Sequence, residues 1–126
     1  MKVHSPLFVK FANEAKMQVT EIDVETLAQA LQGETAPLLI DVREREEWQA
    51  GHIADAIHLS KGVLERDIEK QVPDCHTPMV LYCSGGYRSA LAAYNLQRMG
   101  YQEVYSLKGG TSAWTAAGLD LIKPEA

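Results

Sequence analysis

The chain has 126 residues, of which 46% are hydrophobic and 23% are charged, and its formal net charge is -5 at pH 7. This length fits one domain with a continuous core, and the composition excludes a disordered chain, which combines low hydrophobicity with high net charge. The 12 lysines and arginines are scattered along the chain. We therefore expect no nucleic-acid partner and no attraction to an anionic membrane surface.

The apolar stretches are far shorter than the roughly 20 residues that cross a bilayer, so we expect no membrane-spanning segment. The N-terminal residues mix lysines and a glutamate with apolar side chains and lack the unbroken apolar run of a secretion signal. Only two cysteines occur, Cys75 and Cys83, and a chain of this size needs no disulfide framework to fold. These features predict a cytoplasmic protein with free thiols.

The N-terminal segment carries apolar residues at helical spacing, which predicts a helix over residues 6–17. We assign residues 1–18 to an N-terminal helical extension and residues 19–126 to the main domain. The helix is expected on the outside of the domain, with Phe8 and Phe11 packed against the sheet. A docking surface for a partner protein is the alternative role of this helix.

Five short runs rich in β-branched residues then alternate with helical patterns, which is typical of a parallel sheet covered by helices on both faces. The expected strands are residues 19–22, 38–42, 56–58, 79–82 and 104–107. The second and fourth are continuously apolar and are expected at the centre, with the others nearer the edges. The expected helices are residues 24–31, 62–70, 88–99 and 113–117. The predicted fold class is α/β, with a five-stranded, mostly parallel sheet and an extra N-terminal helix.

One segment joins a strand end to the parts of an anion-binding loop. Cys83 ends a predicted central strand, Gly85 and Gly86 follow it, and Arg88 enters a helix. Ligands of open parallel sheets bind at the carboxyl ends of the strands. The glycines allow successive N–H groups to point toward one atom, and the helix N-terminus stabilises an anion there. Because a thiolate is such an anion, we interpret Cys83 as a nucleophile.

A structural role for Cys83 is the alternative, because cysteine is among the residue types most often buried. Two adjacent glycines cost conformational entropy on folding, however, and a buried strand end needs no arginine five positions later. The whole segment therefore favours a functional cysteine over a structural one.

The segment resembles the rhodanese family, whose active-site loop reads C-x-x-G-x-R-S in many single-domain members. The matching residues here are Cys83, Gly86, Arg88 and Ser89. Residues 41–58 resemble the family's first motif, D-V-R-E-x-x-E-[WY]-x-x-G-H-I-x-x-A-x-H, and residues 109–114 resemble its closing motif, G-G-x-x-A-W. The three motifs stand in the family's order and cover about residues 19–119.

The resemblance implies a rhodanese-like fold and a sulfurtransferase that needs neither a metal nor an organic cofactor. Cys83 is expected to take sulfur from a small sulfur-containing anion such as thiosulfate, to hold it as a persulfide, and to pass it to a thiol or to cyanide. Arg88 is expected to assist the anionic donor. The residues that the resemblance places in the loop cradle are Ser84, Gly85, Gly86, Tyr87, Arg88 and Ser89.

The length of this loop distinguishes the sulfur-transferring members of the family from their phosphatase relatives. Phosphatase relatives hold a tetrahedral phosphate in a seven-residue loop, C-x5-R, whereas the loop from Cys83 through Arg88 has six residues. A smaller cradle fits one sulfur atom better than a phosphoryl group. Phosphatase or arsenate-reducing activity is therefore a minor alternative.

Other charged residues lie near the expected site. Arg43 belongs to the first motif, which mainly braces the fold in this family, and substrate contact is its second possible role. Lys61 and Arg66 follow a strand end, so they either recruit an anionic donor or solvate a helix face. His52 and His58 are expected to be structural, since a metal site needs more ligands.

A second kind of function also agrees with the sequence. The domain could be a persulfide relay or interaction module that receives sulfur from a sulfur-relay protein instead of a small donor. Cys75 is not expected to assist Cys83, because the strand between them separates the two sulfurs by on the order of 20 Å, beyond the reach of a disulfide.

Overall fold

The computed structural model describes residues 4–124 of the chain, and strands and helices alternate along this range. The elements are α1 (Pro6–Lys16), β1 (Thr20–Ile22), α2 (Val24–Leu31), β2 (Leu38–Asp41), α3 (Arg45–Ala50), β3 (Ile57–His58), α4 (Leu64–Gln71), β4 (Met79–Tyr82), α5 (Tyr87–Met99), β5 (Val104–Leu107) and α6 (Gly110–Ala116). None of these helices combines the length and the apolar character that a membrane crossing requires.

The strands form one sheet of five, in the order β1-β5-β4-β2-β3, and every neighbouring pair is parallel. The predicted α/β class and the predicted strands are confirmed. β4 is the central strand and β2 is interior, as their continuous apolar character predicts. The expectation that the last strand lies nearer an edge is wrong, because β5 pairs with β1 on one side and with β4 on the other.

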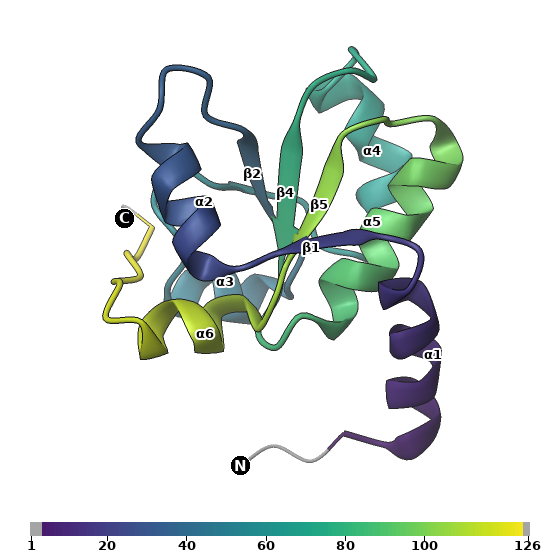
Figure 1. The fold of residues 1–126 in the computed structure, drawn as a ribbon, viewed down its shortest axis with the longest axis horizontal. Coiled ribbons are helices and arrows are strands. Elements are labelled where there is room, and N and C mark those ends of the chain that lie inside the picture. Colours follow the sequence, from purple (N-terminus) through teal and green to yellow (C-terminus); the bar gives the residue numbers. More distant parts are fainter. Residues whose placement is uncertain (1–3, 125–126) are drawn as a thin grey trace.

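Helices cover both faces of the sheet because the side chains of its strands alternate between two cores (Figure 1). On β4, Met79 and Leu81 join the core under α4 and α5, whereas Val80 and Tyr82 join the core under α2 and α6. All four side chains are buried. Cys83 continues this alternation and so faces the α5 side.

The N-terminal helix α1 packs on helix α5 and not on the sheet, so the expected partner of its apolar face was wrong (Figure 1). Ala12 and Ala15 are buried against Ala90 and Leu91, and the three small alanines let the two helices approach closely. Phe8 is partly buried at this contact. Phe11 is 61% exposed and does not pack as expected.

Helix α3 is an element that the apolar pattern does not predict, since none of its residues is buried. A capping box holds its first turn: the Glu44 side chain accepts from the backbone of Glu47, and the Glu47 carboxylate accepts from the backbone N–H of Glu44 at 3.0 Å. The cap at its first turn therefore stabilises this helix, which has no fully buried residue.

The connections of the sheet change direction between β2 and β4. The chain leaves β2 for β3 on one side and leaves β4 for β5 on the other. At such a switch point the loops that follow the two strands turn apart and open a crevice at the carboxyl edge. The segment after β2 and the loop that begins at Cys83 therefore lie beside one another.

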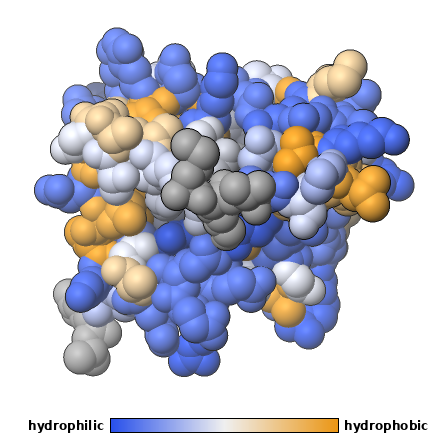
Figure 2. Space-filling model, turned by 90° about the horizontal axis from the view of Figure 1, so that it is seen from below, coloured by the Kyte–Doolittle hydropathy of each residue, from blue (hydrophilic) through white to orange (hydrophobic). Residues whose placement is uncertain are grey.

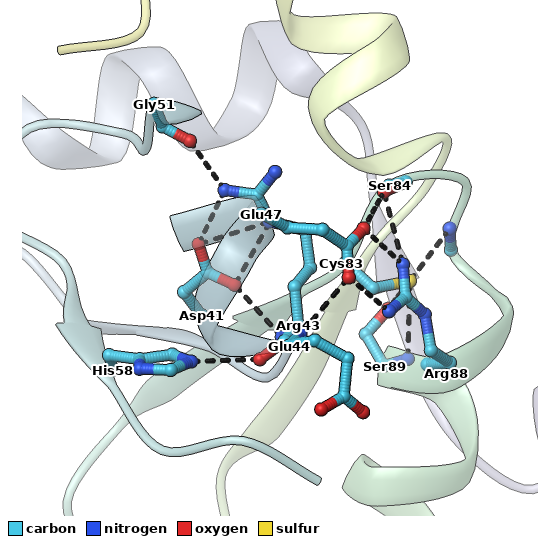
Figure 3. A network of polar contacts seen from close by, with 11 residues as sticks. Asp41, Arg43, Glu44, Glu47, Gly51, His58, Cys83, Ser84, Arg88 and Ser89 are labelled. Atoms are coloured by element: carbon cyan, nitrogen blue, oxygen red, sulfur yellow. Dashed lines mark hydrogen bonds and ion pairs between the residues drawn. The ribbon is translucent and has the colours of Figure 1, made fainter. Parts of the chain in front are cut away.

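A buried ion pair closes the turn after β2. Arg43 donates to the Asp41 carboxylate at 2.8 Å and to the carbonyl oxygen of Gly51 at 2.6 Å, and the two charged side chains are 6% and 0% exposed. The His58 ring donates to the Arg43 carbonyl oxygen at 2.8 Å. This network ties β2 and β3 to Gly51, the residue that follows α3 (Figure 3).

We expect Asp41→Asn to lower the free energy of unfolding by about 3 kcal/mol, because it leaves the buried Arg43 guanidinium without its counter-charge. Urea unfolding followed by circular dichroism measures the change. Asp67→Asn removes the partner of the exposed Arg66 and is the matched control with little expected effect. Equal midpoints for the two variants would show that the buried pair does not stabilise the turn.

Candidate active site

The sulfur of Cys83 lies inside the loop that joins β4 to α5. The residue is 1% exposed. The backbone N–H of Gly86 donates to Sγ at 3.1 Å and that of Ser89 at 3.4 Å, and the Ser89 hydroxyl lies 3.5 Å from Sγ (Figure 3). Gly86 reaches this position with a φ of 96°, which favours glycine. The loop thus directs hydrogen-bond donors at the sulfur, as the sequence predicts.

The carbonyl groups of the same loop point away from the sulfur, toward α6. The N–H of Thr111 donates to the Cys83 carbonyl at 2.9 Å, and the N–H of Ser112 donates to the Ser84 carbonyl at 3.0 Å. Gly110 lies so close to this loop that a Cβ there would collide with the Cys83 carbonyl oxygen. The closing G-G motif therefore fixes the orientation of the loop backbone.

We expect Gly110→Ala to displace the Cys83 loop and to lower the alkylation rate of Cys83 by iodoacetamide at least about tenfold. Peptide-resolved mass spectrometry gives the rate, and circular dichroism reports the fold. Gly118→Ala is the matched control, since Gly118 also has a positive φ of 84° but open space around its Cβ position. Equal rates in the two variants would assign the effect to backbone strain and not to the collision.

Arg88 of the loop is already paired with a carboxylate. Its guanidinium donates to Glu47 at 2.7 and 2.9 Å and to the Ser84 hydroxyl at 3.0 Å, and Ser84 donates to Glu47 at 2.8 Å. The bonds from Arg88, with those from the Glu44 backbone and Ser84, lower the pKa of Glu47 to about 2. This bidentate pair joins α3 to the start of α5 and offsets the charge of Arg88.

The expected pH response of the pair follows from the pKa of Glu47. That pKa is about 2 in the folded protein against an ordinary value of 4.5. The stabilisation is therefore present above pH 4.5 and is lost as the pH falls toward 2. On acidification, the free energy of unfolding should fall by about 1 kcal/mol less in Glu47→Gln than in the wild type. This value is discounted for solvent screening.

Urea unfolding of both proteins at several acidic pH values tests this expectation. Glu46→Gln, on the same helix, is the comparison variant. If the wild type and Glu47→Gln lose stability in parallel on acidification, the carboxylate does not form this ion pair in solution.

Ser106 extends the polar contacts of the loop into the core. It lies on β5 with no exposed surface, and its hydroxyl is 2.8 Å from the hydroxyl of Ser89. Glu47 and Ser106 thus belong to the site, although the pattern around Cys83 in the sequence points to neither residue. The first motif contains Glu47, and a lone serine in a buried strand was the only sign of Ser106.

The two arginines proposed as secondary donor contacts lie elsewhere. Arg43 is buried in the ion pair with Asp41. Arg66 is 73% exposed and pairs with Asp67. Neither side chain lines the pocket at Cys83 among the described residues, so the structure does not bring these arginines to the site.

The histidines of the first motif make contacts within the fold. The His52 ring stacks on Trp48, with ring centroids 3.5 Å apart, and His58 binds the Arg43 carbonyl. The potential metal ligands that lie together in the described chain are Asp74, Cys75 and His76. They occupy the turn before β4, at the opposite end of that strand from Cys83.

A pocket of about 230 Å³ opens above Cys83. The described residues that line it are His4, Phe8, Cys83, Ser84, Gly85, Tyr87, Arg88 and Ser112. The loop forms its floor, and His4 with Phe8 of α1 contributes one side.

The fold and this site define an α/β protein that holds one cysteine in an anion-binding loop at the switch point of a parallel sheet. Residues 23–117 match the family model of the rhodanese-like domain, and the chain belongs to that family. The fold and the family expected from the sequence are thereby confirmed.

Several relatives are named as sulfurtransferases. The chain is 36% identical over 107 residues to a sulfurtransferase of Allochromatium vinosum, across 85% of this chain and 98% of that one. It is 39% identical over 79 residues to the thiosulfate sulfurtransferase GlpE of Coxiella burnetii, across 63% of this chain and 72% of that one. A solved Rhodopseudomonas palustris protein of unknown function, described as a possible tyrosine phosphatase, has a TM-score of 0.80 and 28% identity, over 97% and 98% of the two chains.

Proposed function

We propose that the protein is a rhodanese-type sulfurtransferase that carries sulfur as a persulfide on Cys83. In the first step the Cys83 thiolate attacks the outer sulfur of a donor such as thiosulfate. The sulfur–sulfur bond of the donor breaks, and sulfite leaves with the bonding electron pair. The negative charge of the thiolate then resides on the terminal sulfur of the persulfide.

In the second step an acceptor attacks that terminal sulfur. The bond between the two sulfurs breaks, and Cys83 leaves as a thiolate, ready for another donor. With cyanide the product is thiocyanate. With a thiol the product is a persulfide of the acceptor, which keeps the proton of the thiol. No metal or organic cofactor takes part in either step.

The observation that carries this proposal is the position of Sγ among hydrogen-bond donors. The N–H groups of Gly86 and Ser89 point at it from 3.1 and 3.4 Å, on the first turn of α5. Preorganised donors of this kind stabilise charge on sulfur without reorganisation during the reaction. Two of the relatives named above are sulfurtransferases, which supports the same chemistry.

Phosphatase activity is the second candidate, because one structural neighbour is described as a possible tyrosine phosphatase. The six-residue loop argues against it, as a phosphoryl group needs donors around three oxygens. The arginine of the loop is also paired with Glu47 at 2.7 Å, which offsets the positive charge that a phosphoryl group would require.

The first test is the intact mass of the protein after incubation with thiosulfate and removal of excess reagent. We expect a gain of one sulfur atom in the wild type and in Cys75→Ser, and none in Cys83→Ser, because only Cys83 lies in the donor-lined loop. Addition of cyanide should release the sulfur as thiocyanate, which is measured colorimetrically.

The outcomes separate the candidates. If the persulfide forms only with a cysteine desulfurase and not with thiosulfate, the protein is a persulfide relay that receives sulfur from a partner protein. That result would contradict the proposal of an enzyme that uses a small donor. Hydrolysis of an aryl phosphate that requires Cys83, with no sulfur adduct from either source, would overturn sulfur transfer.

A further inference from the structure

The N-terminal helix reaches the active-site pocket, although it lies outside residues 23–117 that match the family model. Its Phe8 lines the pocket together with His4, which precedes the helix, and with Cys83. The contact of Ala12 and Ala15 with Ala90 and Leu91 anchors α1 on α5. The start of α1 therefore has a fixed position beside the sulfur.

Three rings form one side of the pocket, which we call the aromatic wall: His4, Phe8 and Tyr87. The His4 ring lies 4.9 Å from that of Tyr87 and 5.7 Å from that of Phe8, and Phe8 and Tyr87 are 6.0 Å apart. The inclined geometry of Tyr87 against both rings is favourable for aromatic pairs. Lys16 also makes a cation–π contact with Tyr87, with Nζ 4.4 Å from the ring centroid.

The charges around the pocket are paired. The guanidinium of Arg88 is neutralised by Glu47 at 2.7 Å, and Lys16 lies 3.8 Å from Glu21 and over the Tyr87 ring. Arg43 and Arg66 are directed elsewhere. An anionic substrate thus meets no unpaired arginine or lysine among the described lining residues, whereas an apolar group meets aromatic rings.

We propose that the aromatic wall selects the sulfur acceptor and that the preferred acceptor is an organic thiol with an uncharged, apolar body. This inference rests on the proposed function and names its acceptor class. Apolar groups and sulfur atoms both make favourable contacts with aromatic rings. The pocket volume of about 230 Å³ also suits such a group, since a cavity of ~150 Å³ accommodates benzene.

The surface around the pocket agrees with a local apolar site. Figure 2 shows the molecule from the carboxyl edge of the sheet as a mostly hydrophilic face, with hydrophobic side chains gathered in separate groups, one of them over α1 at the right. The pocket itself, at about 230 Å³, has the size of a small-molecule site. The wall therefore fits a small acceptor.

The test follows discharge of the preformed persulfide. Protein loaded with thiosulfate is freed of donor and mixed with benzyl mercaptan, β-mercaptoethanol or mercaptoethanesulfonate, and loss of the sulfur is timed by intact mass. We expect Phe8→Ala and His4→Ala to lower the rate constant for benzyl mercaptan about fivefold relative to those for the two small thiols. Ratios between variant and wild type cancel the intrinsic reactivity of each thiol.

Phe11→Ala is the matched control, because Phe11 lies on the same helix, is 61% exposed and does not line this pocket. It should leave the ratio unchanged. His4 precedes the helix and is not part of its packed face, so His4→Ala keeps the test valid if Phe8→Ala loosens α1. Equal ratios in wild type, Phe8→Ala and His4→Ala would overturn the selection of the acceptor by the wall.

A second measurement does not require sulfur transfer. Cys83 is alkylated with iodoacetamide or with its N-benzyl derivative, which share one reactive group, and the adduct at Cys83 is quantified by peptide mapping. The wall predicts a preference for the benzyl reagent that Phe8→Ala reduces and Phe11→Ala keeps. If the protein prefers the benzyl reagent but takes up no persulfide sulfur, the proposed function is rejected and the apolar site is retained. If the protein shows no preference for the benzyl reagent, the apolar site is rejected.

Discussion

The active site depends on the orientation of one short stretch of backbone, residues 83–89. Its carbonyl groups are bound by the N–H groups of Thr111 and Ser112 at the start of α6, and its N–H groups are thereby left to face Sγ. Both ends of this stretch are fixed by the fold, because Cys83 directly follows β4 and the loop continues into α5. Three elements around the end of the central strand thus determine where charge on sulfur is stabilised.

A second consequence of this arrangement concerns the loop arginine. The resemblance predicts that Arg88 assists an anionic donor, and in the structure its guanidinium lines the pocket while both of its terminal nitrogens donate to Glu47. Glu47 is in turn held by the cap of α3, which follows β2. The arginine thus connects the segments after the two strands that flank the switch point. Arg88 therefore stabilises the two sides of the crevice relative to each other. The hydrogen bonds to the sulfur itself come from the backbone N–H groups of Gly86 and Ser89.

Much of the fold could be predicted because its signals are local. The amphipathic spacing after Asp23, whose side chain accepts from the N–H of Thr26 at 2.8 Å, and the apolar run of β4 each fix one element. Helix α3 could not be predicted in this way, since it has no buried face and depends on its cap. The site was predictable where one motif contains it, as for Cys83 and Gly86. The roles of Glu47, Ser106 and Phe8 come from pairings between distant segments, which periodicity does not reveal.

The division of the pocket between two parts of the chain has a consequence for how such a protein can diversify. The loop at Cys83 is constrained on three sides: by the buried strand β4, by the glycines of the closing motif and by the Glu47 carboxylate of α3. The segment around His4 and Phe8 touches the pocket from a helix that contacts the remainder mainly through α5. Changes at His4 or Phe8 alter the lining of the pocket at positions that donate no hydrogen bond to the sulfur. Under the acceptor selection proposed above, substitutions in this segment can change the acceptor of a related protein while the residues of the cysteine loop stay the same.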